Sequence, residues 1–309
     1  MDVSIIIVNY NTKELLANCL ESIYRHTKDL EFEVIVSDNG STDDSINLIK
    51  EKYPQVILIE NKENLGFGKA NNRGLEKAQG KYIFYLNSDT LLLNNASKYF
   101  FDYWENADKN PDKEGEIGAL GSNLLNNQKE VIHSYGSFLS YNDEVRNSLR
   151  ALLSISAYTV LSLFSKKYPP LDIPNDKAEF YTGPVDYITG ADLFVKNDRT
   201  ARFDENFFMY CEEADLQLQM SKINKKRLLI EGPQIIHLCG GARKNIYNKV
   251  TSLSKPSSIQ FNISRIYYFK KNGCSKIKIR LLKLITLLTW LNPLIHNKTK
   301  KYKRIMLSI

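Results

Sequence analysis

The first hundred residues alternate between short apolar runs and longer stretches in which apolar residues recur at helical spacing. Continuous apolar runs predict four strands buried on both faces, at residues 3–8, 32–36, 56–59 and 82–86. The first intervening helix is expected to follow Thr12, a residue type that caps helices. Strands that alternate with helices predict right-handed βαβ units. The pattern therefore predicts an α/β fold with a Rossmann-like, mostly parallel sheet flanked by helices.

Three of these strands end in polar residues, namely Asn9-Tyr10-Asn11, Asp38-Asn39 and Asn87-Ser88-Asp89. Open α/β sheets bind ligands beyond the carboxyl ends of their strands, so we expect these residues to line a ligand-binding edge. An acid there can hold a divalent cation against a phosphate, and another can accept the ring N–H of a pyrimidine. Each acid alone is also compatible with an ordinary turn. GxGxxG and GxxxxGK[ST] motifs are absent, so NAD, FAD and P-loop sites are not expected.

Beyond residue 105 the pattern is less regular. A helix is expected at 96–104, and strands at 117–120, 228–230 and 234–236. Residues 149–164 predict an apolar helix of about four turns. This helix is too short to span a bilayer, which leaves a core helix or an interfacial helix as the alternatives.

An acidic cluster follows the aromatic run at residues 203–210. Glu212, Glu213 and Asp215 are expected to open a helix at 212–221. Acids at a helix N-terminus stabilise the helix, and this is the simplest interpretation. Because the preceding residues are mostly aromatic, we expect the acids to emerge from a core-lining segment, where a carboxylate suits a general base.

Charge is distributed unevenly along the 309 residues. The net charge is +7, yet no Asp or Glu follows Glu231, so residues 232–309 carry +16 and residues 1–231 carry −9. A basic tail on an acidic body is expected to meet an anionic surface. No recognisable nucleic-acid module accompanies the charge, so nucleic acid is not expected as a partner.

The tail contains an expected amphipathic helix with basic borders. Its apolar face is formed by Ile277, Leu281, Leu284, Ile285 and Leu288. Lys276, Arg280 and Lys283 border this face, and the stretch is shorter than the ~20 residues that span a bilayer. The pattern favours a helix lying on an anionic membrane surface. The alternative is a helix packed on the preceding domain with a solvated basic end.

Cysteine usage and the first residues indicate the compartment. The four cysteines include no CxxC pair, which argues against a zinc site and a disulfide framework and suits a reducing cytosol. Residues 1–11 lack the basic start of a signal peptide. The sequence sets no oligomeric state.

Four motifs in order, VSIIIVNYN, VIVSDNGSTDDS, NLGFGKANNRGL and YLNSD, give the chain a family resemblance. It resembles the inverting glycosyltransferases of family 2, which have the GT-A fold, and within them the bacterial rhamnosyltransferase-like branch. The resemblance covers residue 3 to about residue 245. It implies a nucleotide-diphospho-sugar donor. UDP and dTDP both suit Asp38, because uracil and thymine share a ring N–H, and the branch favours dTDP-rhamnose.

The resemblance also implies roles for individual residues. Glu213 would be the general base, supported by Glu212 and Asp215, and Asp89 and His237 would bind Mn²⁺ or Mg²⁺. The donor would be bound by Asn9, Tyr10, Asn11, Asp38, Asn39, Lys69, Asn72, Asn87, Ser88, Gly190, Ala191 and Arg243. The chain departs from the family pattern at three positions, because the family usually has Asp at position 87, Asp at position 213 and Arg at position 219.

We therefore interpret the chain as an inverting glycosyltransferase in cell-surface glycan synthesis, with a lipid-linked or polysaccharide acceptor. Residues 1–250 are expected to form the catalytic domain, with a nucleotide-binding half at 1–105 and an acceptor-binding half at 106–250. Residues 251–309 would attach it peripherally to the cytoplasmic, inner face of the cell membrane. Two alternatives are a nucleotidyltransferase and a catalytically silent membrane-bound subunit that binds sugar nucleotides.

Overall fold

The computed structural model describes residues 1–109, 116–164, 178–238 and 253–309. The chain divides into two compact units. The first, called the sheet unit here, comprises Met1–Phe138, Lys177–Phe208 and Glu212–Gly241. The second, called the helical unit, comprises Leu139–Asp176, Met209–Cys211 and Ala242–Ile309. The division differs from the expected boundary at residue 250, because the helix that begins at Tyr141 packs on the C-terminal helices.

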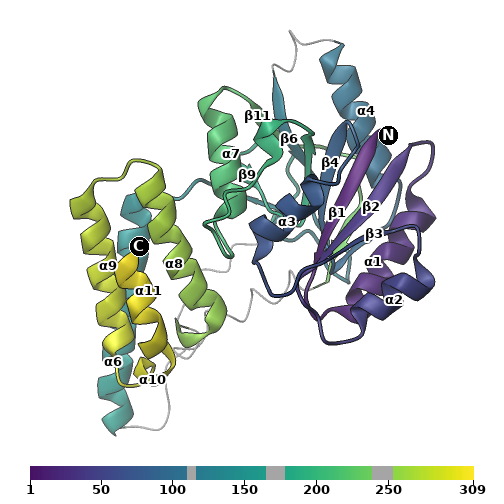
Figure 1. Ribbon diagram of the computed structural model, residues 1–309. Helices are drawn as coiled ribbons and strands as arrows, with labels where there is room; N and C mark the ends of the chain where they lie inside the picture. Colours follow the sequence, from purple (N-terminus) through teal and green to yellow (C-terminus); the bar gives the residue numbers. More distant parts are fainter. Residues whose placement is uncertain (110–115, 165–177, 239–252) are drawn as a thin grey trace. The chain divides into compact units, whose positions relative to one another are not determined.

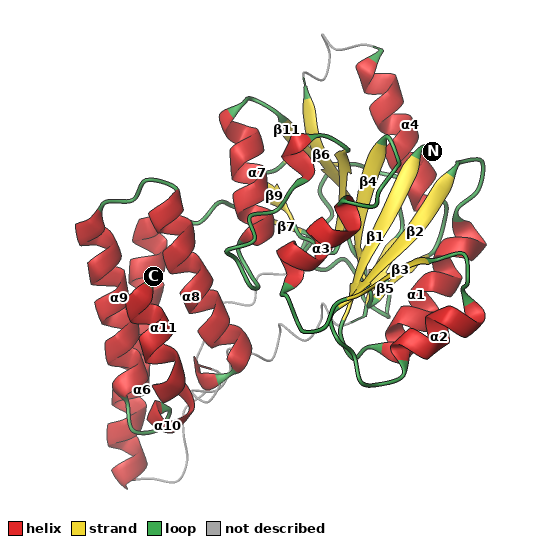
Figure 2. Ribbon diagram, in the orientation of Figure 1, coloured by secondary structure: helices red, strands yellow, loops and turns green. Residues whose placement is uncertain are grey.

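An eight-stranded sheet forms the centre of the sheet unit, with strand order β3-β2-β1-β4-β10-β6-β11-β8 (Figures 1 and 2). Its strands are β1 (Val3–Asn9), β2 (Phe32–Asp38), β3 (Ile57–Glu60), β4 (Tyr82–Asn87), β6 (Ile117–Gly121), β8 (Gly183–Pro184), β10 (Asp192–Lys196) and β11 (Lys226–Leu229). Strands β3, β2, β1 and β4 run parallel, whereas β10 runs antiparallel to both β4 and β6. This arrangement confirms the predicted α/β fold.

Two small sheets complete the strands of this unit. Strand β5 (Thr90–Leu92) pairs with β12 (Ile235–His237), and β7 (Tyr135–Gly136) pairs with β9 (Tyr187–Ile188). The β5–β12 pair places His237 opposite Thr90, close to the end of β4.

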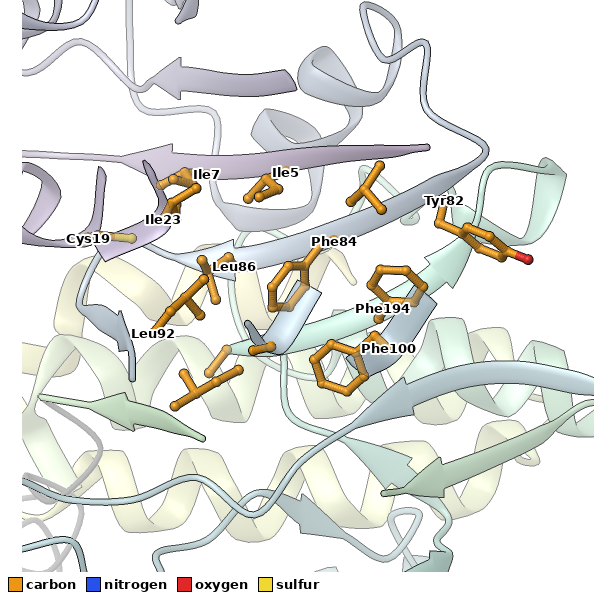
Figure 3. Close-up of a cluster of buried hydrophobic side chains, with 14 of the residues drawn as sticks. Ile5, Ile7, Cys19, Ile23, Tyr82, Phe84, Leu86, Leu92, Phe100 and Phe194 are labelled. Carbon is orange, nitrogen blue, oxygen red and sulfur yellow. The ribbon is translucent and has the colours of Figure 1, made fainter. Parts of the chain in front are cut away.

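Helices cover both faces of the large sheet. Helices α1 (Lys13–His26), α2 (Ser45–Lys52) and α4 (Ala96–Asp108) pack on one face, and α3 (Phe67–Leu75) and α7 (Glu212–Lys222) on the other, with a short 3₁₀ turn at Arg199–Ala201. Alternate residues of β1 face the two layers: Ile5 and Ile7 join the first core, and Ile6 joins the second. Figure 3 shows the first core, where Phe84, Phe100 and Phe194 pack together.

Thr12 stands at the N-cap of α1, as expected, but its side chain makes no capping bond. Instead the Thr12 hydroxyl donates to Asn9 Oδ1 (2.6 Å), and Asp43 Oδ2 accepts the Lys13 N–H (2.8 Å). The capping function therefore comes from the loop after β2, and the Thr12 hydroxyl is used at the strand ends.

The helical unit consists of α6 (Tyr141–Phe164), α8 (Pro256–Lys271), α9 (Lys276–Leu291), α10 (His296–Thr299), a 3₁₀ turn (Lys300–Tyr302) and α11 (Lys303–Ser308). In Figure 1, α6, α8 and α11 each lie beside α9. Buried Arg265 on α8 forms an ion pair with Glu144 on α6 (2.6 Å), and this pair joins the two helices. None of the described helices is both long enough and apolar enough to cross a membrane.

Helix α9 is apolar on two opposite sides. Ile279, Leu282, Ile285 and Trp290 are buried within the helical unit. Ile277, Leu281, Leu284, Leu288 and Leu291 are 43–78% exposed and recur at helical spacing. Four of the five residues expected on one apolar face therefore lie outward, but Ile285 lies inward.

The turn before α3 depends on Gly66. Its φ of +84° with ψ of −178° is accessible to glycine alone, and an added Cβ would overlap the Phe208 carbonyl oxygen. The next N–H, that of Phe67, donates to the same oxygen (2.9 Å). Gly66 thus permits two distant segments of the sheet unit to be joined by a backbone bond.

We predict that Gly66→Ala destabilises the sheet unit by about 3 kcal/mol or more, because strain and overlap add. Gly40→Ala is the matched control, since Gly40 has a φ of +78° but a Cβ there would meet its neighbours no closer than 3.4 Å. The control should lose only about 1 kcal/mol. Urea unfolding measures both, and equal losses would contradict the importance of the Phe208 contact.

Candidate functional site

The ends of β1 and β2 are joined by a buried polar network. The Asp38 side chain is fully buried, and its carboxylate accepts bonds from Asn9 Nδ2 (2.6 Å) and from the N–H groups of Gly40 (3.1 Å) and Ser41 (2.8 Å). Asn9 Nδ2 also donates to Ser41 Oγ (3.0 Å). Asp38 therefore holds its own turn in place and presents that turn at the sheet edge.

Tyr10 and Asn11 lie at the exposed rim of this network. Tyr10 is 48% exposed, and Asn11 has a left-handed φ of +54°. Asn11 bonds to the loop after β2 through Ser41 Oγ (2.9 Å) and the Thr42 N–H (2.7 Å). An exposed aromatic ring beside a fixed polar turn is a suitable place for a base or a ribose to pack.

Asn39 extends the network to the turn before α3. Its amide nitrogen donates to Gly66 O (3.1 Å), and its amide oxygen accepts from Asn61 Nδ2 (3.1 Å). Asn39 is buried, and its amide group joins the loop after β2 to the segment between β3 and α3.

A second chain of bonds connects this network to the end of β4. The Thr12 hydroxyl, bonded to Asn9, lies 3.0 Å from the buried Ser88 Oγ. The register places Val8 opposite Asn87 and Asn9 opposite Asp38. The structure therefore brings together the three polar strand ends that the sequence singled out.

Asp89 and His237 lie side by side. Asp89 Oδ1 is 3.2 Å from His237 Nε2, and Asn87 Nδ2 is 3.5 Å from the same nitrogen. The β5–β12 pairing, with His237 opposite Thr90, sets this approach. Among the described residues no three His, Cys, Asp or Glu side chains form a metal cluster. A carboxylate beside an imidazole nevertheless fits a divalent cation whose other ligands are phosphates and water.

The acidic helix α7 meets this edge at Gly190. The Asn87 N–H donates to Ala191 O (3.1 Å), and a Cβ on Gly190 would lie 3.0 Å from the Phe67 ring and 3.9 Å from Glu213 Cβ. Glu213 is half-buried, whereas Glu212 and Asp215 are buried. Glu213 is therefore the most accessible of the three acids and lies beside the Gly190–Ala191 segment.

The sequence did not single out Phe67, whose ring lies beside Gly190, or Gln217. The buried Gln217 side chain accepts the Ile188 N–H (2.8 Å) and donates to Ile188 O (2.7 Å), which fixes α7 to the strand before Gly190. Hydrogen bonds from a glutamine to a distant backbone leave no sequence pattern. The departure at Gln219 has a visible consequence too, since its amide donates to Asp215 Oδ1 (3.3 Å).

The remaining predicted residues lie on α3 or outside the described chain. Asn72 is buried, and its amide group bonds to the Phe203 N–H (2.9 Å), Phe203 O (2.9 Å) and Glu205 Oε1 (3.0 Å). This arrangement uses Asn72 to fix α3 to a neighbouring segment. Lys69 is half-buried on the same helix. Arg243 lies outside the described residues.

Comparison with solved structures defines the fold class as GT-A. A mannosyltransferase from Pyrobaculum calidifontis in complex with GDP-Man and Mn²⁺ matches 97% of this chain and 73% of its own, with a TM-score of 0.52 and 16% identity. S. aureus TarS 1-349 matches 100% of this chain and 91% of its own, with a TM-score of 0.50 and 15% identity. At these identities the likeness establishes the fold alone.

Sequence comparison finds a family match in the first part of the chain. Residues 4–110 match the family described as Glycosyl transferase family 2. A poly(ribitol-phosphate) beta-glucosyltransferase of Bacillus spizizenii is 33% identical over 108 residues, which are 33% of this chain and 17% of that protein. Chondroitin synthase of Escherichia coli is 33% identical over 133 residues, 39% of this chain and 19% of that protein. The chain thus matches less than a quarter of the length of these relatives, and the comparisons support a glycosyltransferase.

The buried carboxyl of Asp192, the residue after Ala191, should make the stability of the fold depend on pH. Its buried carboxyl accepts the Ser122 N–H and hydroxyl (2.7 Å each), and burial raises its pKa from 3.8 to about 8. Between these values the folded chain keeps a proton that the unfolded chain releases, so stability should fall as pH rises through this window. Asp192→Asn should remove this slope and therefore gain stability relative to wild type at pH 8 compared with pH 5.

Urea unfolding at pH 5 and pH 8 measures this difference. Glu51→Gln, at an exposed carboxylate on α2, is the control and should follow the wild type at both values. If Asp192→Asn also follows the wild type, Asp192 does not retain its proton in the folded chain.

Proposed function

We propose that the chain is an inverting glycosyltransferase that moves a sugar from a nucleotide-diphospho-sugar to an acceptor hydroxyl. The observation that carries the proposal is the bonded path from the Asp38 turn through Asn9, Thr12 and Ser88 to the Asp89–His237 pair. Such an edge suits a base and ribose at one end and a diphosphate at the other. The family match over residues 4–110 covers all of this edge except His237.

Asp89 and His237 are the residues that would hold Mn²⁺ or Mg²⁺. When bound there, a divalent cation would offset the negative charge on the departing nucleotide diphosphate. The Pyrobaculum mannosyltransferase, which shares the fold and is in complex with Mn²⁺, supports a divalent ion of this kind. The chain itself contributes the buried turn at Asp38, which fixes the edge before the donor arrives.

Glu213 is the proposed general base. It would take the proton of the acceptor hydroxyl while that oxygen attacks the anomeric carbon on the face opposite to the leaving diphosphate. One displacement forms the new glycosidic bond, breaks the bond to the diphosphate and inverts the configuration. The half-buried position of Glu213 beside Gly190 supports this role, since a base must reach the acceptor and still be shielded from bulk water.

We further propose a UDP-sugar or dTDP-sugar donor, with dTDP-rhamnose favoured by the resemblance of the motifs. The acceptor would be a lipid-linked glycan or a polysaccharide of the cell surface. Relatives named as a poly(ribitol-phosphate) beta-glucosyltransferase and a teichoic acid poly(glycerol phosphate) polymerase support an envelope polymer as the acceptor class.

The helical unit is the proposed contact with the inner face of the cell membrane. The outward face of α9, formed by Ile277, Leu281, Leu284, Leu288 and Leu291, presents large apolar side chains next to exposed Lys276 and Arg280. A second copy of the chain would bring together two faces with the same positive border. An anionic bilayer instead complements both the apolar residues and the charge.

We expect Glu213→Gln to reduce sugar transfer at least about 100-fold, because general-base catalysis contributes roughly that much, while donor binding stays within about twofold. Purified chain is incubated with UDP- and dTDP-sugars, with and without Mn²⁺, and with a polysaccharide acceptor. Glu51→Gln is the matched control and should transfer at the wild-type rate.

The same assay separates the alternatives. Release of the nucleoside diphosphate marks a glycosyltransferase, whereas release of pyrophosphate from a nucleoside triphosphate marks a nucleotidyltransferase. Donor binding without turnover marks a silent subunit, an alternative that Asn87 and Gln219 favour. Undiminished transfer by Glu213→Gln removes Glu213 from the role of base.

We expect Leu281→Gln combined with Leu284→Gln to weaken binding to anionic vesicles about tenfold or more, because two exposed leucines lose their burial in lipid. Co-sedimentation with phosphatidylglycerol vesicles measures the binding. Ile223→Gln, an equally exposed apolar position in the sheet unit, is the control and should bind as wild type. Unchanged sedimentation of the double variant would exclude α9 as the membrane contact.

A further inference from the structure

The surface of the helical unit has an open cavity of about 930 Å³, lined mostly by exposed side chains, that lies apart from the outward apolar face of α9. Its wall is formed by the start of α8 and by the chain from residue 297 to residue 304. Five of its lining side chains are cations, namely Lys255, Lys298, Lys300, Lys301 and Arg304. The proposed transfer reaction uses none of them.

No carboxylate balances these cations in the described chain. Within the helical unit the described acids are Asp143, which pairs with Arg146, and Glu144, which pairs with Arg265. After Glu231 the sequence contains no further acid. Next to the cavity Lys303 bonds to His296, and Lys301 lies over the Tyr302 ring (4.9 Å to the ring centre), a contact that leaves its charge in place. The cavity therefore concentrates positive charge that the described part of the protein does not neutralise.

The start of α8 adds to this positive potential. Helix α8 has 16 residues and begins at the cavity with Lys255 as N-cap and Pro256 as its first residue. The Lys255 side chain makes no capping bond, so it does not satisfy the N–H groups of the first turn. A helix N-terminus favours a bound anion through its dipole, and here it coincides with five cations around one cavity.

We propose that this cavity binds a phosphate or diphosphate group. Phosphate oxygens accept bonds from ammonium, guanidinium and backbone N–H donors together, and these are the donors that the cavity provides. Neutral sugars or bases would leave the cations unbalanced. The phosphate has two possible sources, a soluble or acceptor-borne diphosphate and the headgroup of an anionic lipid. The proposal goes beyond sugar transfer and does not depend on Glu213.

The test titrates inorganic pyrophosphate into the full chain by calorimetry, with EDTA present to remove any metal that would favour the donor site. Wild type should bind pyrophosphate saturably. Lys298→Ala combined with Lys301→Ala should bind it about tenfold more weakly, because two charged donors are lost. Lys276→Ala combined with Arg280→Ala removes the same charge outside the cavity and should change binding less than about twofold. Circular dichroism checks folding, and Lys298→Gln with Lys301→Gln replaces the alanine variant if that variant unfolds.

Equal weakening in the two double variants, or no saturable binding to wild type, would overturn the proposal in favour of diffuse charge. A second arm assigns the source with vesicles containing phosphatidic acid. Competition by pyrophosphate, together with weaker vesicle binding by the Lys298→Ala and Lys301→Ala variant than by wild type, supports a lipid headgroup. If the Lys298→Ala and Lys301→Ala variant binds vesicles as wild type does but no longer binds pyrophosphate, the phosphate is a soluble or acceptor-borne one. Donor turnover is measured on the same preparations, so failure of the cavity and failure of the proposed transferase are observed separately.

Discussion

The sheet unit depends on the close approach of the backbone at Gly66 and Phe67 to the Phe208 carbonyl. These segments are far apart in the sequence, and a backbone bond between them holds α3 against the chain that leads to α7. Phe67 then packs against the Gly190 position, which in turn lies beside Glu213. A glycine at 66 is required because any side chain would occupy the volume of the carbonyl oxygen. Together with the bonds of Asn72 to Phe203 and of Gln217 to Ile188, this contact sets the relative position of the donor edge and the acidic helix.

A buried polar network keeps that edge rigid before any ligand binds. Asp38 is fully buried, yet its carboxylate accepts three bonds, so its burial is compensated. The neighbouring amides of Asn9 and Asn39 join three loops into one surface. Networks of this kind are stable only when every member has a partner, and they fix a single geometry when they do. Preorganisation of the donor edge is the physical consequence.

The helical unit has two distinct surfaces, an apolar face on α9 and a group of cations at the start of α8, which the sequence pattern alone does not distinguish. Helix α9 buries Leu282 and Ile285 and exposes Leu281 and Leu284, so one helix serves both a core and an outward face. The cations near the chain end gather instead around a cavity at the start of α8. The apolar face of α9, with Lys276 and Arg280 at its border, and this second group of cations are therefore separate surfaces of the same unit, and each can be changed without the other.

The sequence by itself determined the order of strands and helices in the first hundred residues, their place in a mostly parallel sheet, and the polar strand ends at Asn9, Asp38 and Asp89, because these follow from local periodicity and from the geometry of βαβ units. It also singled out Glu213 and His237, through motif order. The tertiary structure alone decided that α6 joins the C-terminal helices, that Thr12 bonds to Asn9 instead of capping α1, and that Asn72 and Gln217 fix backbone segments. Each of these depends on contacts between residues distant in sequence, and no local pattern records which distant backbone atom a side chain will meet.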